Sequence, residues 1–192
     1  MKLLEERIKK DGKVYPGDIL KIDSFLNHQI DIKLLEEIGK EIKRLFPNEK
    51  PTKILTIEAS GIAIASIVDQ NFDYVPVIFA KKNKALNMSG NVYASQERSY
   101  TRGEMIDVQV SKEYLNENDT VLIVDDFLAN GEAMNSLIDI CNQAKAKICG
   151  CCAIVCKTYQ PGEERIKKYG VHLECLARVK SMTDDGQIEF ED

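Results

Sequence analysis

Residues 121–133 constrain the fold more than any other part of the chain, and they read VLIVDDFLANGEA. Four apolar residues run directly into two adjacent acids, Asp125 and Asp126, and a run of mostly small residues follows. A continuous apolar run of this kind predicts a strand that is buried on both faces of a parallel sheet. We therefore expect an α/β fold whose central strand, residues 121–124, presents two carboxylates at its carboxyl end.

The turn after the two acids is suited to an anion. Its residues are Ala129, Asn130, Gly131, Glu132 and Ala133, and a helical pattern begins directly afterwards. Backbone amides at a helix N-terminus attract negative charge, and small side chains leave the approach to them open. Taken alone, the turn could simply cap a helix, and the acids could simply be solvated. Together they predict a ligand with both hydroxyls and a phosphate, such as a phosphorylated ribose.

Strand and helix patterns alternate along the rest of the chain. We expect helices over residues 2–10, 32–45, 61–70, 134–144 and 163–169, and further strands over residues 53–57, 75–80, 105–110, 148–156 and 172–177. Such alternation predicts a mostly parallel sheet covered by helices on both faces, with ligands beyond the carboxyl ends of its strands. Residues 58–61, 81–84, 125–131 and 157–159 should therefore project from one edge. The polar stretch over residues 81–104 is long for a connection and predicts a lid.

Length and charge narrow the class of protein. At 192 residues the chain should form a single domain, and its net charge of −5 argues against nucleic acid as the main partner. No apolar run approaches the roughly 20 residues that a membrane span requires. The charged N-terminus also lacks the apolar core of a signal peptide. We expect a cytoplasmic protein that binds neither nucleic acid nor membrane.

Six cysteines raise the question of a metal site, because Cys149 and Cys152 form a C-x-x-C pair. The surrounding segment, residues 148–156, is otherwise apolar and reads as a buried strand. A zinc site would need a second ligand pair at a comparable spacing, and the sequence offers none. We therefore interpret these cysteines as core thiols and expect no metal held by protein ligands alone.

Three segments together resemble one family. Residues 121–133 closely resemble the phosphoribosyl-pyrophosphate binding motif of the type I phosphoribosyltransferases. Within that family, the form Asp-Asp-Phe-Leu-Ala-Asn-Gly is similar to that of the bacterial xanthine phosphoribosyltransferases, as are residues 20–31 and residues 157–162. The resemblance implies a parallel sheet flanked by helices, a flexible hood loop over about residues 84–100, and a homodimer. It also implies a small base-binding hood subdomain within about residues 1–50 of the single domain.

The resemblance assigns the donor site. Asp125 and Asp126 would be catalytic and face the ribose hydroxyls, and the turn 129–133 would bind the 5-phosphate. The expected contacts to the pyrophosphate are Glu58, Ser60, Gly61, Lys81 and Lys82, with Mg²⁺ carried in on the donor. From the residues alone, the first three could form an ordinary strand-to-helix turn, and the lysines could be a solvated basic run.

For the base, the resemblance points to Leu20, Asn27 and Lys157, and Phe127 is placed to stack on a purine ring. A lysine ammonium and an asparagine amide can each donate a hydrogen bond to a ring carbonyl of xanthine. Without the resemblance, Asn27 would be interpreted as the cap of the helix over residues 32–45. Lys157 would be interpreted as a surface residue at a strand end.

The implied reaction converts xanthine and 5-phospho-α-D-ribose 1-diphosphate to xanthosine 5′-monophosphate and pyrophosphate. One alternative within the family is transfer to guanine, hypoxanthine or adenine. Another is a purine-operon regulator that binds the donor without turning it over. Such regulators add a basic N-terminal DNA-binding domain, whereas residues 1–53 are mixed in charge. A transferase is therefore the preferred interpretation.

Overall fold

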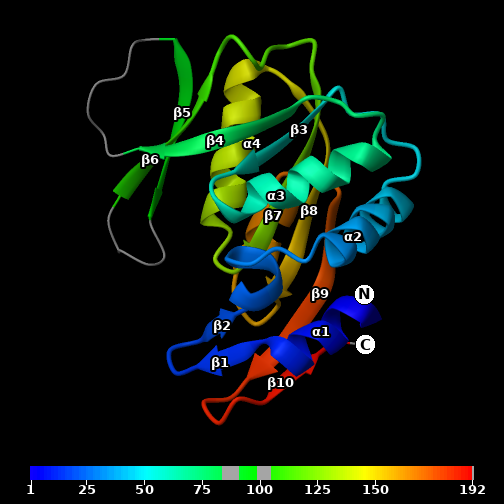
Figure 1. The fold of residues 1–192 in the computed structure, drawn as a ribbon. Coiled ribbons are helices and arrows are strands. Elements are labelled where there is room, and N and C mark those ends of the chain that lie inside the picture. The colour runs from blue at the N-terminus through cyan, green and yellow to red at the C-terminus, as the bar shows by residue number, and fades with distance from the viewer. Residues whose placement is uncertain (84–90, 99–104, 192) are drawn as a thin grey trace.

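The computed structural model describes residues 1–83, 91–98 and 105–191, and a single large sheet organises them (Figure 1). Its strand order is β10-β9-β8-β7-β3-β4-β6-β5. The strands from β9 to β4 run parallel, and β5, β6 and β10 join antiparallel at the edges. The bounds are β3 Lys53–Ile57, β4 Val77–Asn83, β5 Val92–Arg98, β6 Met105–Ser111, β7 Thr120–Leu128, β8 Lys147–Lys157, β9 Leu173–Met182 and β10 Ile188–Phe190. The predicted α/β fold is confirmed.

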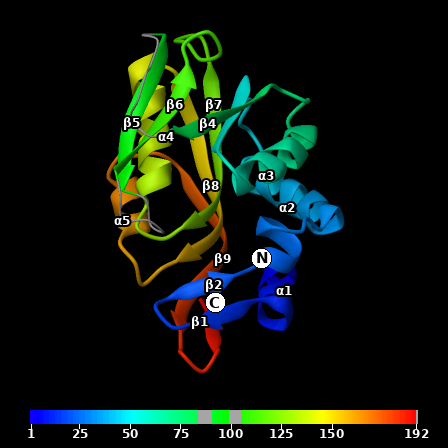
Figure 2. The same cartoon turned by 60° about the vertical axis from the view of Figure 1, so that its left-hand side comes forward.

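Helices cover both faces of the sheet, as Figure 2 shows. Helices α1 (Lys2–Asp11), α2 (Ile32–Leu45) and α3 (Ser60–Val68, followed by the 3-10 turn Asp69–Asn71) share one core with Leu122 and Val124. Helices α4 (Glu132–Ala144) and α5 (Gly162–Lys167) share the other core with Val121 and Ile123. Successive residues of β7 thus enter opposite cores, which explains why residues 121–124 are all apolar.

Strand β7 is longer than the sequence predicts. It was expected to end at Val124, but it continues through both acids to Leu128. Strand β8 pairs with it along this whole length, and Leu128 lies opposite Cys156. Because β8 supplies hydrogen-bond partners past the acids, Asp125 and Asp126 belong to the strand and not to the loop beyond it.

The N-terminal part contains a hairpin that the sequence analysis did not predict. Strands β1 (Lys13–Tyr15) and β2 (Ile19–Lys21) form a separate two-stranded sheet, and the π-helix η1 (Asp23–Asn27) follows. Leu20 of β2 is buried in the core beneath α1 and α2. The hairpin therefore has its body anchored in the domain while its tip projects from it.

The described residues of the expected long lid lie mostly in strands. Residues 81–83 extend β4 and pair with β6, and residues 92–98 form strand β5. Regular backbone pairing thus replaces the predicted loop over residues 81–83. Residues 84–90 and 99–104 of the expected lid, which include much of the expected hood loop over about residues 84–100, lie outside the described part of the chain. Within the described part, no helix is long and apolar enough to cross a membrane.

Candidate active site

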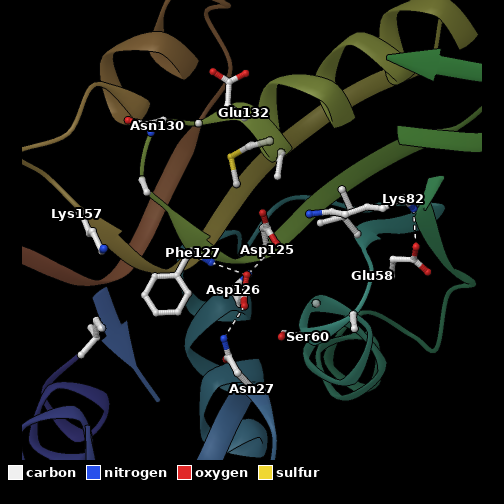
Figure 3. Close-up of a pocket in the computed structure, with 18 of the residues that line it drawn as sticks. Asn27, Glu58, Ser60, Lys82, Asp125, Asp126, Phe127, Asn130, Glu132 and Lys157 are labelled. Carbon is white, nitrogen blue, oxygen red and sulfur yellow. Dashed lines mark hydrogen bonds between the residues drawn. The ribbon is translucent and has the colours of Figure 1, made fainter. Parts of the chain in front are cut away.

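A cavity of about 880 Å³ opens where β3, β4 and β7 reach their carboxyl ends. This volume lies in the range of small-molecule sites. In Figure 3 the acid pair lies at its centre, with Phe127 and Lys157 on one side and Glu58, Ser60 and Lys82 on the other. The cavity therefore has two distinct ends, and the acid pair lies between them.

Asp125 is the buried member of the acid pair, with 3% of its surface exposed. Its Oδ1 accepts a hydrogen bond from the Asp126 amide at 2.9 Å. Burial raises the pKa of Asp125 well above its ordinary value, and the adjacent charge of Asp126 raises that pKa further. Asp125 thus lies in the cavity wall, where burial and the neighbouring carboxylate both oppose its ionisation.

The Asp126 side chain reaches into the cavity and links strand β7 to the π-helix η1. Its Oδ1 accepts from the Phe127 amide at 2.9 Å, and its Oδ2 accepts from Asn27 Nδ2 at 2.9 Å. Asn27 ends the π-helix, and the cap of α2 is instead Asp31, which accepts from the Leu34 amide at 3.2 Å. The interpretation of Asn27 as that helix cap is therefore wrong.

The turn between β7 and α4 is held in place by a close backbone contact. Gly131 caps α4 with a φ of 78°, a conformation that glycine adopts without strain. The Gly162 amide donates to the Ala129 carbonyl at 2.9 Å, and a Cβ at Gly162 would lie 2.2 Å from that oxygen. Arg165 further pairs with Glu132. The first amides of α4 are consequently presented to the cavity in a fixed arrangement.

The N-terminus of helix α3 faces the end of the cavity away from Phe127 and Lys157 (Figure 3). Helix α3 begins at Ser60, and the Glu58 side chain accepts from the Lys82 amide. Gly61 packs against β3 so closely that a Cβ would lie 2.0 Å from Thr56 Oγ1. This contact brings bare backbone to the cavity wall, as an anion site requires.

The Phe127 end of the cavity contains Leu20, Asn27 and Lys157. Lys157 is 5% exposed, and its ammonium donates to the backbone carbonyl of Asp18. Burial lowers the pKa of Lys157, and the nearby charge of Asp18 opposes that change. Asn27 Oδ1 is buried, and no hydrogen-bond partner for it is found in the described part of the chain. This end therefore presents an aromatic face, a donor and an oriented acceptor.

The cavity brings together all but one of the predicted site residues. Its lining includes Leu20, Asn27, Glu58, Ser60, Gly61, Lys82, Asp125, Asp126, Phe127, Ala129, Asn130, Gly131, Glu132, Ala133 and Lys157. Lys81 instead lines a second hollow on the neighbouring face, because successive residues of β4 point in opposite directions. The sequence analysis assigned no role to Asp18, Gly162 or Arg165. Asp18 and Arg165 belong to no pattern that marks a ligand site, and Gly162 lies in the segment 157–162 that carries the resemblance.

Residues 21–186 match the family described as phosphoribosyl transferase domain. The chain belongs to the phosphoribosyltransferase family. This phosphoribosyltransferase is 54% identical to a protein of Lachnoclostridium phytofermentans named xanthine phosphoribosyltransferase, over 99% of this chain and 98% of the relative. It is 53% identical to a protein of the same name from Clostridium novyi, over 99% of both chains.

Solved structures agree on the fold of this phosphoribosyltransferase. The adenine phosphoribosyltransferase of Giardia lamblia, solved with 9-deazaadenine, superposes with a TM-score of 0.77 over 91% of this chain and 97% of the other. The two sequences are 20% identical. This likeness establishes the type I phosphoribosyltransferase fold that the sequence predicts.

The cysteines of the phosphoribosyltransferase lie away from the cavity and are unpaired. Cys149 and Cys152 pack in the core that α2 covers, whereas Cys141, which belongs to α4, and Cys151 pack in the core on the other face of the sheet. Burial raises the pKa of Cys149 to about 11 and that of Cys141 to about 12. Among the described residues, no group of three or more histidine, cysteine or acidic side chains is placed to hold a metal ion.

Proposed function

We propose that the protein is a xanthine phosphoribosyltransferase, which transfers the phosphoribosyl group of 5-phospho-α-D-ribose 1-diphosphate to xanthine. The observation that carries the proposal is the order of groups across the cavity. A base-sized end with Phe127 and Lys157 is followed by the acid pair and then by the N-terminus of α3. A purine, a ribose and a pyrophosphate require that order. The curated relatives named for this activity span nearly the whole chain.

The choice of base rests on the polarity of two side chains. A lysine ammonium has three donors and no acceptor, so Lys157 suits a ring carbonyl and repels an amino group. A carboxylate only accepts, so Asp126 orients the Asn27 amide with Nδ2 toward itself and leaves Oδ1 as an acceptor. Xanthine alternates carbonyls with N–H groups around its six-membered ring. It therefore offers a partner to both side chains, whereas adenine carries an amino group in place of the 6-carbonyl.

In the proposed reaction, N9 of xanthine forms a bond to C1 of the ribose while the bond from C1 to the pyrophosphate oxygen breaks. The electron pair leaves with the pyrophosphate, and the base releases one ring proton. Positive charge develops on the ribose between the base and the leaving group. Asp125 and Asp126 hold the hydroxyls, and the Asp126 carboxylate supplies negative charge beside that centre, so positioning and electrostatics provide most of the acceleration.

Mg²⁺ enters this proposal as part of the substrate. The donor carries it on its pyrophosphate, where it neutralises the leaving group. Mg²⁺ keeps much of its water and takes one or two protein carboxylates together with phosphate oxygens. Asp126, whose carboxylate lines the cavity, fits that role, and a larger cluster of protein ligands is not required.

We also propose that the active form is a homodimer. A hollow of about 620 Å³ beside β4 and β6 is lined by Val77, Phe79, Lys81 and Tyr114, among others. Phe79 and Tyr114 are 38% and 57% exposed. A second copy would cover these rings and place Lys81 close to its partner's surface. Sedimentation equilibrium should give twice the monomer mass, and Phe79→Glu should give the monomer mass.

The cysteines favour a reducing compartment. None of the six forms a disulfide in the structure. Free thiols of this kind persist where glutathione and thioredoxin keep cysteines reduced. We therefore propose that the protein acts in the cytoplasm. A fusion to a fluorescent protein, imaged in a native host, should show diffuse cytoplasmic signal.

The activity is tested by incubating the protein with the donor, Mg²⁺ and one purine at a time, and separating the nucleotide products. Xanthosine 5′-monophosphate should form from xanthine with release of an equal amount of pyrophosphate. The double variant Asp125→Asn, Asp126→Asn should lose roughly 100-fold or more in turnover, because charge beside the reacting carbon is removed. Absence of any nucleotide product from every purine would refute the proposal.

A further inference from the structure

The tip of the β1–β2 hairpin is held to the main domain by one residue, Asp18. Its carboxylate accepts hydrogen bonds from Tyr159 Oη and Gln160 Nε2, and its backbone carbonyl accepts from Lys157 Nζ. All three partners lie in one four-residue segment that leaves strand β8. A single residue of the hairpin thus meets three donors from the opposite wall of the cavity. We call this set of contacts the Asp18 clasp.

The hairpin needs such a tertiary contact. Its strands are three residues long and pair only with each other, at Lys13↔Lys21, Val14↔Leu20 and Tyr15↔Ile19. An isolated two-stranded hairpin is marginally stable in water. Leu20 anchors the body of the hairpin in the core, but Pro16 and Gly17 at the tip are exposed. The position of the tip therefore depends on what Asp18 contacts.

The other half of the clasp is rigid. The Thr158 amide donates to the Val179 carbonyl at 2.9 Å, and Thr158 Oγ1 donates to the same oxygen at 3.1 Å. Two residues beyond Gln160, Gly162 rests on the turn that precedes α4. The segment is thus fixed to β9 at one end and to the turn at the other, so the clasp positions the hairpin against a fixed wall.

The hairpin forms part of the base end of the cavity. Gly17, Ile19, Leu20 and Lys21 line the cavity, as does Lys157 on the opposite side. The backbone at Asp18 is left-handed, with a φ of 68°. This conformation is uncommon outside glycine, although aspartate tolerates it better than most residues. The chain keeps a carboxylate at a position where glycine would be less strained, which suggests that the carboxylate is used.

We propose that Asp18 is a positioning residue for the base: it holds the hairpin tip against residues 157–160 so that Leu20 and Lys157 face each other across the purine. This inference rests on the proposed function and extends it to a residue that does not touch the substrate. Without the clasp the hairpin must be ordered when the base binds, and that ordering weakens affinity for the base alone. The donor contacts at α3 and α4 do not involve the hairpin.

The test compares Asp18→Gly with Asp73→Gly. Both positions have left-handed backbone, with φ values of 68° and 61°, so glycine relieves the same strain in each variant. Asp73 is exposed and lies outside the cavity lining. Asp18→Gly should raise KM for xanthine about tenfold and leave KM for the donor within about twofold, because only the hairpin is released. Asp73→Gly should change neither constant.

Two further measurements keep the result interpretable. Asp18→Asn retains an acceptor for Tyr159 but not a second one for Gln160, so its KM for xanthine should lie between wild type and Asp18→Gly. Hydrogen exchange of the amides in residues 13–21 should accelerate in Asp18→Gly and not in Asp73→Gly, whatever the reaction catalysed. An unchanged KM for xanthine in Asp18→Gly, or an equal rise in both KM values, would overturn the proposal. Failure of the proposed function is a different result, because wild type would then form no nucleotide.

Discussion

Asn27 Nδ2 lies 2.9 Å from Asp126 Oδ2 and joins the N-terminal segment to the central strand of the sheet across the cavity. The contact links a residue at the base end to a carboxylate beside the ribose position. Because the bond orients the asparagine amide, one side chain both completes the base site and fixes Asp126. Substitutions at Asn27 should therefore affect base binding and transfer together.

Replacing Asn27 with aspartate tests this dual role. A carboxylate cannot donate to Asp126, and two like charges would face each other in the half-buried cavity wall. Asn27→Asp should lower kcat/KM for xanthine by roughly 100-fold at neutral pH. The matched control is Asn118→Asp on an exposed loop, which should keep wild-type kinetics. Steady-state assays at saturating donor decide the matter, and wild-type kcat/KM in Asn27→Asp would contradict the assigned role.

Asp125 should lower the stability of the folded protein near neutral pH while contributing to turnover. Its pKa is raised in the folded protein, so its contribution to stability is present at low pH and is lost as pH rises through the raised pKa. Asp125→Asn mimics the protonated form and keeps an acceptor for the Asp126 amide. We expect this variant to melt at a higher temperature than wild type at pH 7 to 8, with little difference near pH 4, and to lose turnover. Melting curves across that range measure the effect, and an equal difference at every pH would argue against buried ionisation.

The sequence predicts some parts of this site and misses others. Asp125, Asp126 and the turn after them belong to one continuous run, so local patterning locates them. The end of β7 was misplaced because pairing with β8 carries the strand past two acids, a tertiary effect that local polarity does not report. The hairpin is too short to produce a recognisable alternation, and the donors that meet Asp18 come from more than 130 positions away, with a separation of 141 residues for Tyr159.

Strand β4 is a second place where the structure separates residues that the sequence analysis grouped together. Lys81 and Lys82 are adjacent in sequence and were assigned the same role. Their placement in a strand sends Lys82 to the cavity and Lys81 to the hollow beside Phe79. A loop would have allowed both lysines to reach the donor, whereas alternation in a strand does not.

The contact between Gly162 and the turn before α4 should govern affinity for the donor. A methyl group at Gly162 would lie 2.2 Å from the Ala129 carbonyl and push the turn away from its position. Gly162→Ala should therefore raise KM for the donor about tenfold or more, with a smaller effect on KM for xanthine. Gly170→Ala beyond the end of α5 serves as control for a destabilising methyl group: it strains a left-handed backbone with a φ of 69° but meets no atom within 4 Å outside its chain neighbours, so it should lower stability and leave KM for the donor unchanged. Equal KM values for the donor in wild type and Gly162→Ala would contradict a role for this contact.

The buried cysteines should be unreactive toward alkylating reagents in the folded protein. Burial raises the pKa of Cys149 to about 11 and that of Cys141 to about 12, so the reactive thiolate is scarce at pH 8. Iodoacetamide at pH 8 should leave Cys141, Cys149, Cys151 and Cys152 unmodified in native protein and modify all of them in urea. Mass spectrometry of tryptic peptides provides the measurement. Rapid labelling of Cys149 or Cys152 in native protein would reopen a redox role for the C-x-x-C pair.

The central claim is that Lys157 and the oriented Asn27 select an oxopurine and favour xanthine. It is tested most directly by measuring kcat/KM for xanthine, guanine, hypoxanthine and adenine at saturating donor and Mg²⁺. Guanine, hypoxanthine and adenine each lack one or both of the carbonyls that xanthine presents, and a buried donor left without its partner discriminates strongly. Xanthine should give the highest kcat/KM, by about tenfold or more over guanine and hypoxanthine, and adenine the lowest. A kcat/KM for adenine equal to or above that for xanthine would contradict the account.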